Sequence, residues 1–574
     1  MNLNSVSEPL WHIRDKHPQI ESVSLRFGLH PCAAQVLLNR VEDENLIEDY
    51  LNPRLQTLPH PQLLSDIERA SALIIHALKN HISICVYGDY DVDGTSSSAI
   101  LVENLRAFGG IVNYYLPHRL KQGYGLHESA VQEIYQANHR LLITCDLGVS
   151  NAQEVLFAKS LGLSVIIVDH HQVPQQLPDA DAVINPHRPD DQFPFKNLCA
   201  AGVCFYLMSM VRALLKEDKE WMTTYNAKEE PLRDLRLSLD LVALATVADM
   251  VPLTGINRIL VARGLEYIRQ GTRPGLAALA RVCEAVSTKI DAQTLAFKLG
   301  PRINAAGRMG SAMRCVDLFL SDGLRATDLA TQLDQENNVR RETEESVFNE
   351  ACAQAEALLS ASVVPDALVL FNAYWHPGVL GIVASRLVER FFKPVIVIGQ
   401  SGKGSARSVP HLHLLKAIEK SAAHLLKFGG HHLAAGVTVK PGEEVLFRQA
   451  FSDNMRAILL EQGHSPHVLS IDGLLAYEDL NDALIQDLAR VGPFGSGNPE
   501  PVFALLQVAV KNRRLVGQDH LKLELANGLH AIAFKQAQHK AAQSPYLDLA
   551  VTPFVSEYLG RKRIELRVKA MRLA

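Results

Sequence analysis

Three aspartates stand at alternate positions directly after an apolar stretch. From residue 88 the chain reads Gly-Asp-Tyr-Asp-Val-Asp-Gly-Thr, which places carboxylates at Asp89, Asp91 and Asp93. Carboxylates this close repel one another unless a cation neutralises them, and their oxygens are the ligands that Mg²⁺ and Mn²⁺ prefer. Two other interpretations stay open. One is an Asx-rich turn that caps the next helix, and the other is a calcium loop, although Ile100 stands where that loop needs a bidentate Glu.

An acid followed by two histidines forms a second candidate group. Asp169, His170 and His171 come directly after the apolar run at 163–168. Imidazole binds transition metals, and a neighbouring carboxylate can fix the orientation of the ring. A lone histidine is more often structural, but a histidine pair after an acid favours a metal site.

The elements that must position these residues follow from the hydrophobic pattern. Short apolar runs alternate with helical stretches, which predicts a parallel sheet with helical crossovers. Strands are expected at 82–87, 111–116, 140–145 and 163–168. The carboxyl ends of parallel strands meet at one edge, where ligands bind. Asp146 follows the third run, and Asp249 follows an apolar segment in which a buried acid would need a partner.

Mixed Asp and His ligation fits a centre that holds two Mn²⁺ or Mg²⁺ ions. Such a pair can lower the pKa of a bridging water and stabilise both oxygens of an in-line phosphoryl displacement. Phosphoester hydrolysis is therefore the leading reaction class. The chain contains no G-x-x-x-x-G-K-[ST] motif, which disfavours a P-loop ATPase.

Three later segments combine arginine or glycine with small residues and could hold phosphates. They span residues 301–308, 404–408 and 428–436. Arginine binds phosphate through two parallel hydrogen bonds, and glycine lets backbone N–H groups approach an anion. A helix C-cap or a tight turn explains Gly429 and Gly430 equally well.

The composition is that of an ordinary globular protein. The 574 residues are 47% hydrophobic and 21% charged, with a net charge of −5. No apolar run is long enough for a transmembrane helix, and the N-terminus shows no secretory signal, which favours the cytoplasm. None of the eight cysteines forms a C-x-x-C pair, so reduced thiols are expected instead of a disulfide scaffold or a zinc finger.

The pattern along the chain predicts several segments in succession. They are a helical segment at 1–75, an α/β block at 76–320, a long helix within 321–360, a second α/β block at 361–464 and an all-β module at 465–574. That last module has about five strands, compatible with a small barrel. Residues 501–574 carry twelve Lys/Arg against five Asp/Glu, which suggests a surface that faces a polyanion. A solvated charged surface is the alternative.

These strings, in this order, resemble the DHH phosphoesterase superfamily, named for an Asp-His-His such as Asp169 to His171. Within it the chain resembles the single-strand-specific exonucleases. The likeness is carried by residues 89–94, 117–119, 169–171, 246–249, 301–308, 429–431 and 492–499. It implies an α/β fold with a DHH parallel-sheet catalytic domain, a connecting helix, a DHHA1 α/β domain and a C-terminal all-β OB-fold.

The resemblance also implies roles for particular residues. Two Mn²⁺ or Mg²⁺ ions would be held by Asp91, Asp93, Asp146, His170 and Asp249, with Asp146 bridging. In the catalytic group, Asp89 would lie close by, Asp169 would orient, and His171 would contact the attacking water or the scissile phosphate. The candidates for phosphate and DNA contacts are Arg119, Arg302, Asn304, Arg308, Ser405, Arg407, Gly429, Gly430 and His431. The barrel would follow the backbone through Lys511, Arg513, Arg514, Arg561, Lys562 and Arg563.

The implied activity is hydrolysis of single-stranded DNA from the 5′ end with release of mononucleotides. One departure from the superfamily pattern is Leu147, where a polar Asn or Cys is usual. Another is Tyr87, at a position where some DHH phosphatases have a histidine, which argues against the pyrophosphatase branch.

Two alternatives stay open. A small-nucleotide phosphodiesterase would share the catalytic sheet but have little use for the basic module at 465–574. A binding protein built on a decayed core predicts lost ligands, whereas all five expected ligands are present. The superfamily likeness further implies a monomer that cooperates with a single-stranded-DNA-binding protein and a RecQ-type helicase in recombination and repair.

Overall fold

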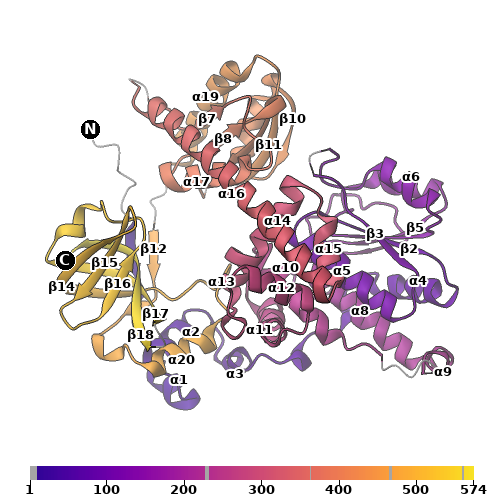
Figure 1. The fold of residues 1–574 in the computed structure, drawn as a ribbon, viewed down its shortest axis with the longest axis horizontal. Coiled ribbons are helices and arrows are strands. Elements are labelled where there is room, and N and C mark those ends of the chain that lie inside the picture. Colours follow the sequence, from indigo (N-terminus) through magenta and orange to yellow (C-terminus); the bar gives the residue numbers. More distant parts are fainter. Residues whose placement is uncertain are drawn as a thin grey trace. The chain divides into compact units, whose positions relative to one another are not determined.

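The computed structural model describes the chain in seven stretches (Figure 1): residues 9–119, 121–226, 232–361, 364–410, 412–463, 468–558 and 561–574. The chain divides into two compact units, which are described one at a time. The first contains Leu116–Tyr124 and Pro301–His467, and the second contains Pro9–Tyr115, Gly125–Gly300 and Val468–Ala574. Within the described stretches, no helix combines the length and apolar character that crossing a membrane requires.

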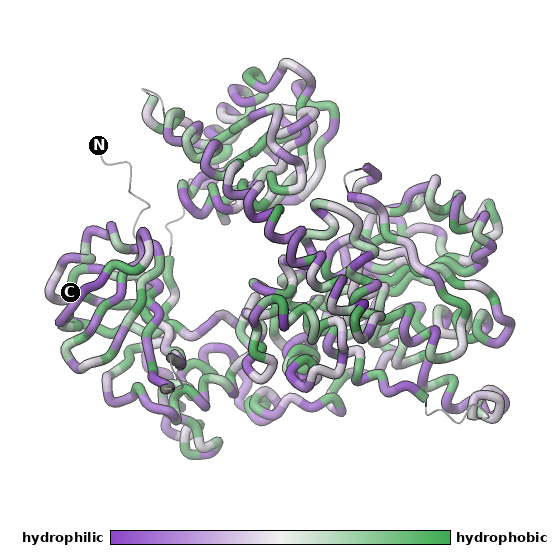
Figure 2. The backbone as a smooth tube through the Cα atoms, viewed as in Figure 1, coloured by the Kyte–Doolittle hydropathy of each residue, from purple (hydrophilic) through white to green (hydrophobic). Residues whose placement is uncertain are grey.

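The second unit contains the predicted parallel sheet. Its strands are β2 (Ile84–Gly88), β3 (Val112–Tyr115), β4 (Leu141–Cys145), β5 (Ser164–Val168) and β6 (Ala182–Ile184). They are parallel throughout, in the order β3-β2-β4-β5-β6. Hydrophobic residues run along these strands (Figure 2), and β2 and β4 are buried along their whole length. Both faces are therefore covered by helices, as the near-continuous apolar runs predict.

The helices of the second unit agree with the predicted α/β alternation. They are α1 (Ile20–Phe27), α2 (Pro31–Leu38), α3 (Ile47–Leu51), α4 (Ile67–Lys79), α5 (Val92–Ala107), α6 (Glu128–Gln136), α7 (Ala152–Ser160), α8 (Ala200–Glu217), α9 (Lys219–Asn226), α10 (Leu239–Ala248), α11 (Gly255–Gln270), α12 (Pro274–Val282), α13 (Ala292–Thr294) and α20 (Asp482–Val491). Helices α6 and α7 pack on one face of the sheet around Val131 and Val155. Helices α5, α8 and α10 pack together on the other side.

A buried ion network ties α5 to α10. Arg273 donates from Nε to Asp240 Oδ2 at 2.7 Å and from Nη1 to Glu103 Oε2 at 2.8 Å. Arg273 is only 8% exposed. The arginines beside Glu103 hold the pKa of that carboxyl below its ordinary value although burial raises it. Because the network joins one acid on each helix, it fixes the distance between the two helices.

The C-terminal part of the second unit is the predicted barrel. Its strands are β13 (Gly473–Leu474), β14 (Phe503–Val516), β15 (His520–Leu525), β16 (His530–Ala533), β17 (Tyr546–Tyr558) and β18 (Arg561–Leu573). The order is β13-β14-β15-β16-β18-β17, and pairing of β14 with β17 closes the barrel. Strands β14 to β18 form the closed barrel, and the two-residue β13 extends it alongside β14, which confirms the predicted module of about five strands.

The N-terminal segment shares the core of this barrel. Apolar residues of α1, α2 and α3 pack with α20 and the barrel strands in one cluster. A short strand that the sequence did not predict, β1 (Leu10–Ile13), pairs in parallel with β12 (Val468–Ile471). Four residues are too few to show a period, and the partner strand lies far away in the chain.

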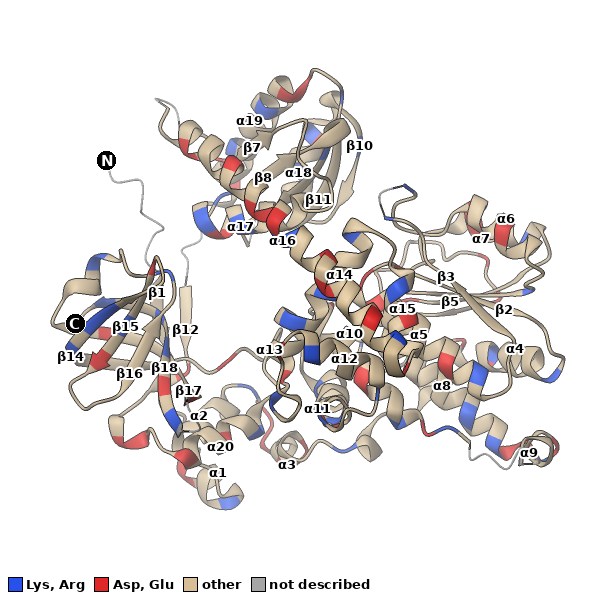
Figure 3. Cartoon of the chain, viewed as in Figure 1, with Lys and Arg blue, Asp and Glu red and all other residues tan. Residues whose placement is uncertain are grey.

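Basic and acidic residues both lie on the barrel strands (Figure 3), and several of them pair with one another. Lys511 pairs with Glu524 at 2.8 Å, and Arg513 donates to the carbonyl of Ala542 at 2.9 Å. The side chain of Arg561, which the sequence placed in the basic set, lies outside the described residues. The excess of positive charge predicted for residues 501–574 is thus partly balanced within the fold.

The first unit contains a second sheet and the long helix. The strands β7 (Leu368–Phe371), β8 (Val395–Ile398), β9 (Lys403–Arg407), β10 (Leu425–Gly430) and β11 (Ala434–Val439) have the order β10-β11-β9-β8-β7. The helices are α14 (Gly300–Met309), α15 (Met313–Leu320), α16 (Gly323–Leu359), α17 (Leu380–Phe391), α18 (Leu414–Lys420) and α19 (Glu444–Gln462). The long helix predicted within 321–360 is α16.

Replacing Arg273 by methionine is expected to destabilise the second unit strongly. Asp240 would stay buried without its counter-charge, and Glu103 would keep only Arg233, at 3.0 Å. A buried carboxylate left unpaired costs about 3–5 kcal/mol of unfolding free energy. The measurement is the midpoint of urea unfolding followed by circular dichroism. Arg236→Met is the matched control, because its pair with Asp234 is exposed and should leave the midpoint nearly unchanged. Equal midpoints for the two variants would contradict the assignment.

Candidate metal centre

Three neighbouring strands end in acids at the same edge of the parallel sheet. The register pairs Gly88 with Cys145 and Cys145 with Val168. The next residue of each strand is therefore Asp89, Asp146 and Asp169, as the sequence predicted. Asp249 joins them from the C-terminal end of α10.

The side chain of His170 stands among three acids, two of them from this edge and the third Asp93 in the first turn of α5. Its Nε2 lies 3.2 Å from Asp146 Oδ1, 3.7 Å from Asp93 Oδ2 and 3.8 Å from Asp249 Oδ2. This nitrogen is buried and makes no hydrogen bond of ordinary geometry with any described residue. A buried polar atom of this kind requires a partner, and a cation between imidazole and carboxylates would supply it.

The ligand-type atoms gather in three overlapping groups, each within 4.8 Å. They are Asp146, His170 and His171; then Asp93, His170 and Asp249; and then Asp89, Asp91 and Asp146. Asp146 and His170 each belong to two groups. Hard carboxylate oxygens with one or two imidazoles are a donor set that fits Mn²⁺ and Mg²⁺.

Local hydrogen bonds explain the spacing of the first three aspartates. Asp91 Oδ1 caps α5 by accepting from the backbone N–H of Asp93 at 2.9 Å and of Gly94 at 3.1 Å. The capping alternative is thus correct for Asp91, which still lies in the acidic cluster. A Cβ at Gly94 would lie 2.5 Å from the carbonyl oxygen of Asp89, so the turn requires glycine there.

Asp93 is fixed from a distant part of the chain. Its two carboxylate oxygens accept from the backbone N–H groups of Ala200 at 2.7 Å and Ala201 at 2.8 Å. These groups belong to the first turn of α8, where the helix dipole favours a negative charge. The start of α8 is a site element that sequence reasoning missed, because backbone donors leave no mark in residue types.

The backbone at Asp146 is strained. Its φ is +65°, a conformation that few residues other than glycine adopt. Leu147, the departure noted in the sequence, is fully buried in the apolar cluster beneath this edge. Its side chain therefore packs below the acids, and its carbonyl accepts from Thr144 Oγ1 at 3.0 Å.

Asp169 holds the histidine pair in place. Its Oδ1 accepts from the backbone N–H of His170 at 2.7 Å and lies 2.7 Å from His171 Nδ1. The bond with Asp169 raises the pKa of His171 to about 9, although burial, the largest single effect, acts to lower it. The bonds from His171 likewise hold the pKa of Asp169 below its usual value against the effect of burial. These bonds fix the position of both histidines, and the orienting role that the family resemblance implies for Asp169 is consistent with them.

The site carries more negative charge than it can hold alone. Burial, followed by repulsion from the neighbouring aspartates, raises the pKa of Asp146 well above its ordinary value. The same causes raise the pKa of Asp249 to about 8. Asp93 is 1% exposed and Asp146 is 3% exposed. Only bound protons or cations relieve this repulsion.

Two further site residues follow β6, a three-residue strand that the sequence did not reveal. Asn185 is fully buried and donates from Nδ2 to the carbonyl of His171 at 2.8 Å. Nearby His187 has a pKa lowered by burial and then by His170. The signal was present, since Asn185 and His187 follow a strand end, but the strand was too short to predict.

The predicted phosphate contacts all lie in the first unit. Ser405 pairs with Gly436, and Gly436 pairs with Gly429, across β9, β11 and β10. A Cβ on Gly429 or Gly436 would meet nothing within 4 Å, so this stretch of sheet is open. A Cβ on Gly430 would collide with the carbonyl oxygen of Ala434, so that glycine serves the turn.

Arg407 lies at the border of this open stretch. A Cβ at Gly381, in the first turn of α17, would lie 3.1 Å from Arg407 Nη2 and 3.5 Å from Ser405 Oγ. Burial and then the nearby charge of Arg119 lower the pKa of Arg407. Two guanidinium groups that repel each other favour a bound anion, which would relieve the repulsion.

The other predicted contacts have partners within the first unit. On α14, Arg302 pairs with Asp334 at 2.7 Å, and Arg308 donates to the carbonyl of Gly378 at 3.0 Å. Asn304 lies between them on the same helix. His431 is exposed at the turn between β10 and β11, where its N–H donates to the carbonyl of Ala434 at 2.8 Å.

Comparison with known proteins identifies the relatives of this chain. The family model described as "DHH family, N-terminal domain" matches residues 83–246, "DHHA1 domain" matches 364–457 and "RecJ OB domain" matches 471–570. The Single-stranded-DNA-specific exonuclease RecJ of Salmonella typhimurium is 40% identical over 478 residues, covering 80% of this chain and 81% of that protein. The chain belongs to the RecJ family.

Other members of the RecJ family agree over nearly the whole length. The RecJ of Bacillus subtilis is 32% identical over 578 residues, covering 98% of this chain and 71% of that protein. The crystal structure of RecJ from Thermus thermophilus in complex with Mn²⁺ matches with a TM-score of 0.84 and 29% identity. That match covers 99% of this chain and 80% of the solved one. The predicted fold class, with DHH, DHHA1 and OB domains, is confirmed.

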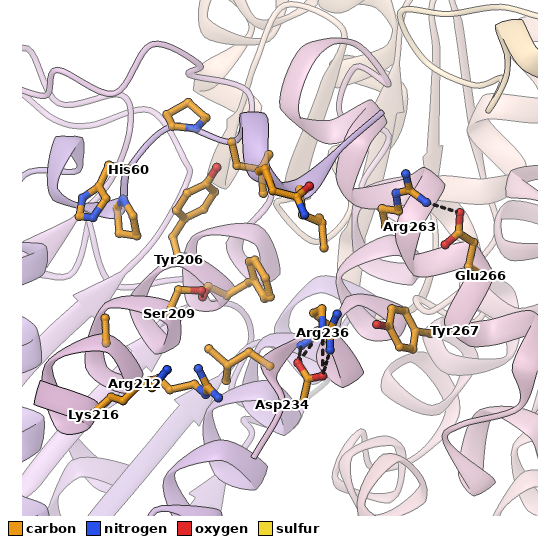
Figure 4. Close-up of a pocket in the computed structure, with 18 residues that line it drawn as sticks. His60, Tyr206, Ser209, Arg212, Lys216, Asp234, Arg236, Arg263, Glu266 and Tyr267 are labelled. Atoms are coloured by element: carbon orange, nitrogen blue, oxygen red, sulfur yellow. Dashed lines mark hydrogen bonds and ion pairs between the residues drawn. The ribbon is translucent and has the colours of Figure 1, made fainter. Parts of the chain in front are cut away.

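A separate cavity of about 930 Å³ lies in the second unit, away from the acidic edge (Figure 4). One face of α8 lines it together with the segment at 55–61, residues 234–236 and α11. Arg236 and Arg263 in its wall are neutralised by Asp234 and Glu266. None of its lining residues belongs to the acidic cluster, so this cavity is distinct from the candidate metal centre.

Mn²⁺ is expected to stabilise the protein more at about pH 8 than at about pH 6. The raised pKa of Asp249, about 8, means that this carboxyl favours the fold at low pH. That contribution is fully present below its ordinary pKa of 3.8 and is lost as the pH rises through about 8. A bound ion must displace the proton from the Asp249 carboxyl. Competition between the proton and the ion therefore falls as the pH rises towards 8.

The measurement is the rise in melting temperature with Mn²⁺ relative to chelator at the two pH values. Asp249→Asn removes the titrating group and should flatten the difference. An equal rise at both pH values in the unsubstituted protein would contradict the account.

Proposed function

We propose that this chain is a metal-dependent exonuclease that hydrolyses single-stranded DNA from the 5′ end and releases mononucleotides. The observation that carries the proposal is the gathering of Asp93, Asp146, His170 and Asp249 around one buried point in a chain of the RecJ family. Its relatives supply the substrate class, since they are single-stranded-DNA-specific exonucleases.

The acidic edge would hold Mn²⁺ or Mg²⁺, the ions bound in solved RecJ structures. We assign Asp91, Asp93, Asp146, His170 and Asp249 as ligands. Asp146 and His170 each belong to two of the groups, and we propose Asp146 as the shared ligand because a carboxylate has two oxygens to offer to two ions. Bound there, the ions would lower the pKa of a water and offset the charge of the phosphate. Asp89 adds a further carboxylate next to Asp91 and Asp146.

The chain itself would orient the reacting groups. Asp169 fixes the ring of His171 through Nδ1, which makes Nε2 the nitrogen that would contact the scissile phosphate or the attacking water. Asn185 holds the carbonyl of His171 from below. Because both supports are buried, the histidine loses little conformational freedom when substrate binds.

The open sheet of the first unit would bind the strand. Arg407 and Arg119 offer guanidinium groups to phosphates, and Ser405 offers a hydroxyl. Gly429 and Gly436 keep the surface flat, so a nucleic-acid backbone can approach the strands closely. Arg302, Asn304, Arg308, Gly430 and His431 are proposed as neighbouring contacts or as supports of the same surface.

Specific observations favour the exonuclease over the two alternative functions. A binding protein with a decayed core would have lost part of its ligand set, yet the acids and His170 lie within 4.8 Å of one another in overlapping groups. A small-nucleotide phosphodiesterase would not need the closed barrel, which family comparison matches to a RecJ OB domain. OB-folds bind single strands by charge and stacking.

Cellular context follows from the family rather than from the geometry. We propose a cytoplasmic protein in DNA recombination and repair, with a single-stranded-DNA-binding protein and a RecQ-type helicase as partners. The eight cysteines are free thiols, which agrees with a reducing compartment. The domains are proposed to follow the predicted boundaries near residues 76, 321, 361 and 465.

A single-stranded oligonucleotide labelled at either end tests the activity. With Mn²⁺ or Mg²⁺, the 5′ label should appear at once in mononucleotide, whereas a blunt duplex and a chelated reaction should give none. Asp93→Ala and His170→Ala should each lower the cleavage rate by more than about 100-fold. Substitutions of residues that only support the metal ligands typically lower activity by about 10- to 100-fold.

The matched control is Asp179→Ala, which removes an exposed acid of the same unit that pairs with Lys159. It should cut DNA at the unsubstituted rate. Binding of the strand without cleavage under any metal would reject the exonuclease and favour the binding protein.

Arg407→Ala should weaken binding of single-stranded DNA and reduce the salt dependence of binding by about one phosphate contact. Arg407→Lys keeps the charge and should retain the salt slope. Arg390→Ala, on α17 of the same unit with Glu356 as its partner, should change neither. The measurement is a fluorescence titration at several salt concentrations, and an unchanged slope for Arg407→Ala would remove this residue from the interface.

A further inference from the structure

The motif at 492–499 has no role in the proposed chemistry, yet it contacts the segment that carries Asp249. The motif reads Gly-Pro-Phe-Gly-Ser-Gly-Asn-Pro and joins α20 to β14 of the barrel. Both parts belong to the second unit. We call residues 492–499 the glycine loop.

The glycine loop packs tightly against Pro252 and Leu253. Leu253 N–H donates to the carbonyl of Ser496 at 2.7 Å. A Cβ on Gly495 would lie 2.7 Å from Leu253 Cδ1, and one on Gly497 would lie 2.8 Å from Pro252 Cβ. Real Cβ atoms do not approach this closely. A side chain at Gly497 would displace the rigid ring of Pro252 and with it the segment, whereas one at Gly495 would first push the end of the buried Leu253 side chain.

Buried polar side chains keep the loop and the segment together. Arg258 on α11 is 3% exposed and donates from Nη2 to the carbonyl of Gly492 at 2.6 Å. Asn498 is 1% exposed and donates to the carbonyl of Pro493 at 2.9 Å. Asn257 donates to the carbonyl of Pro252 at 3.0 Å. Neighbouring residues of α11, Asn257 and Arg258, thus hold the segment and the glycine loop, and the bond of Asn498 stiffens the loop itself.

The other end of the glycine loop is attached to the barrel. Glu500, the next residue after the loop, pairs with Lys569 at 2.9 Å and with Arg567 at 3.3 Å on β18. The loop therefore bridges the barrel and the segment at 252–253.

Asp249 depends on this segment for its position. It is the C-cap of α10, with its N–H donating to the carbonyl of Ala245 at 2.8 Å, and Met250 next to it has a φ of +60°. Only two residues separate Asp249 from Pro252. Because Met250 already holds a strained backbone, a shift of Pro252 would be passed to the carboxylate.

We infer that the glycine loop positions Asp249 within the metal site, so that the barrel sets the affinity of the site for its ion. The inference rests on the proposed ligand role of Asp249. Gly495, Gly497, Arg258 and Asn498 are positioning residues in this account, since none belongs to the acidic cluster.

Gly497→Ala tests the inference against a matched glycine. Gly497 has a φ of +69°, and Gly517 in the barrel turn between β14 and β15 has a φ of +63° with nothing within 4 Å of its Cβ position. Both alanine variants bear similar backbone strain, but only the first displaces Pro252. We expect Mn²⁺ binding, measured by calorimetry, to weaken about 10-fold or more for Gly497→Ala and to stay unchanged for Gly517→Ala.

A compensating pair of substitutions distinguishes a specific steric effect from misfolding. Gly495→Ala adds a carbon where Leu253 Cδ1 stands, and Leu253→Val shortens the neighbour by one carbon. Gly495→Ala alone should weaken Mn²⁺ binding, and the double variant should recover most of the affinity. Equal affinity in the single and double variants would overturn the inference.

A double-mutant cycle with Asp249→Asn locates the effect. If the glycine loop acts through Asp249, Gly497→Ala should cost no further Mn²⁺ affinity in the Asp249→Asn protein. Full additivity would overturn the inference. A failure of the unsubstituted protein to bind Mn²⁺ at all would instead reject the proposed function, so the two failures are distinguishable.

Discussion

Mutual repulsion among buried carboxylates is the constraint on which the rest of this structure depends. Asp89, Asp93 and Asp146 are almost completely buried at one sheet edge, and the pKa of Asp146 is raised accordingly. A fold does not gather acids in this way without an opposing charge. The N–H groups of Ala200 and Ala201 offset part of the charge, and a cation would offset the rest.

The scaffold is arranged to hold that repulsion in place. The register of the parallel strands places their acids side by side at one edge of the sheet. The N-terminus of α8, the positive end of its dipole, lies at Asp93. Helix α5 starts at the site and α10 ends there, while the buried network around Arg273 ties the two helices together. The glycine loop adds support from the barrel to the segment after Asp249. Strain at Asp146 is tolerated because the neighbouring strand holds its backbone, whose N–H donates to the carbonyl of Val168 at 3.0 Å.

Much of this architecture could be predicted from the sequence, for identifiable reasons. Apolar runs of five or six residues mark β2, β4 and β5, and acids directly after them mark the edge. The Asp-His-His string is rare enough to indicate a metal site. Strand β6 was missed because three residues show no period, and Asn185 was missed with it. The donors at Ala200 and Ala201 are backbone groups that no residue type reveals.

Long-range pairing explains the remaining gaps. The alignment of Ser405, Gly436 and Gly429 depends on strand register, which local pattern does not specify. The shared core of the N-terminal helices and the barrel joins segments more than 400 residues apart, as Tyr50 Oη donating to the carbonyl of Val491 illustrates. The predicted roles of the individual ligands and phosphate contacts stay predictions.

Anomalous diffraction from crystals grown with Mn²⁺ tests the central claim most directly. The account predicts anomalous peaks among Asp93, Asp146, His170 and Asp249, with Asp146 touching both if two ions bind. At saturating Mn²⁺, peaks elsewhere or a well-ordered acidic edge without any peak would contradict it.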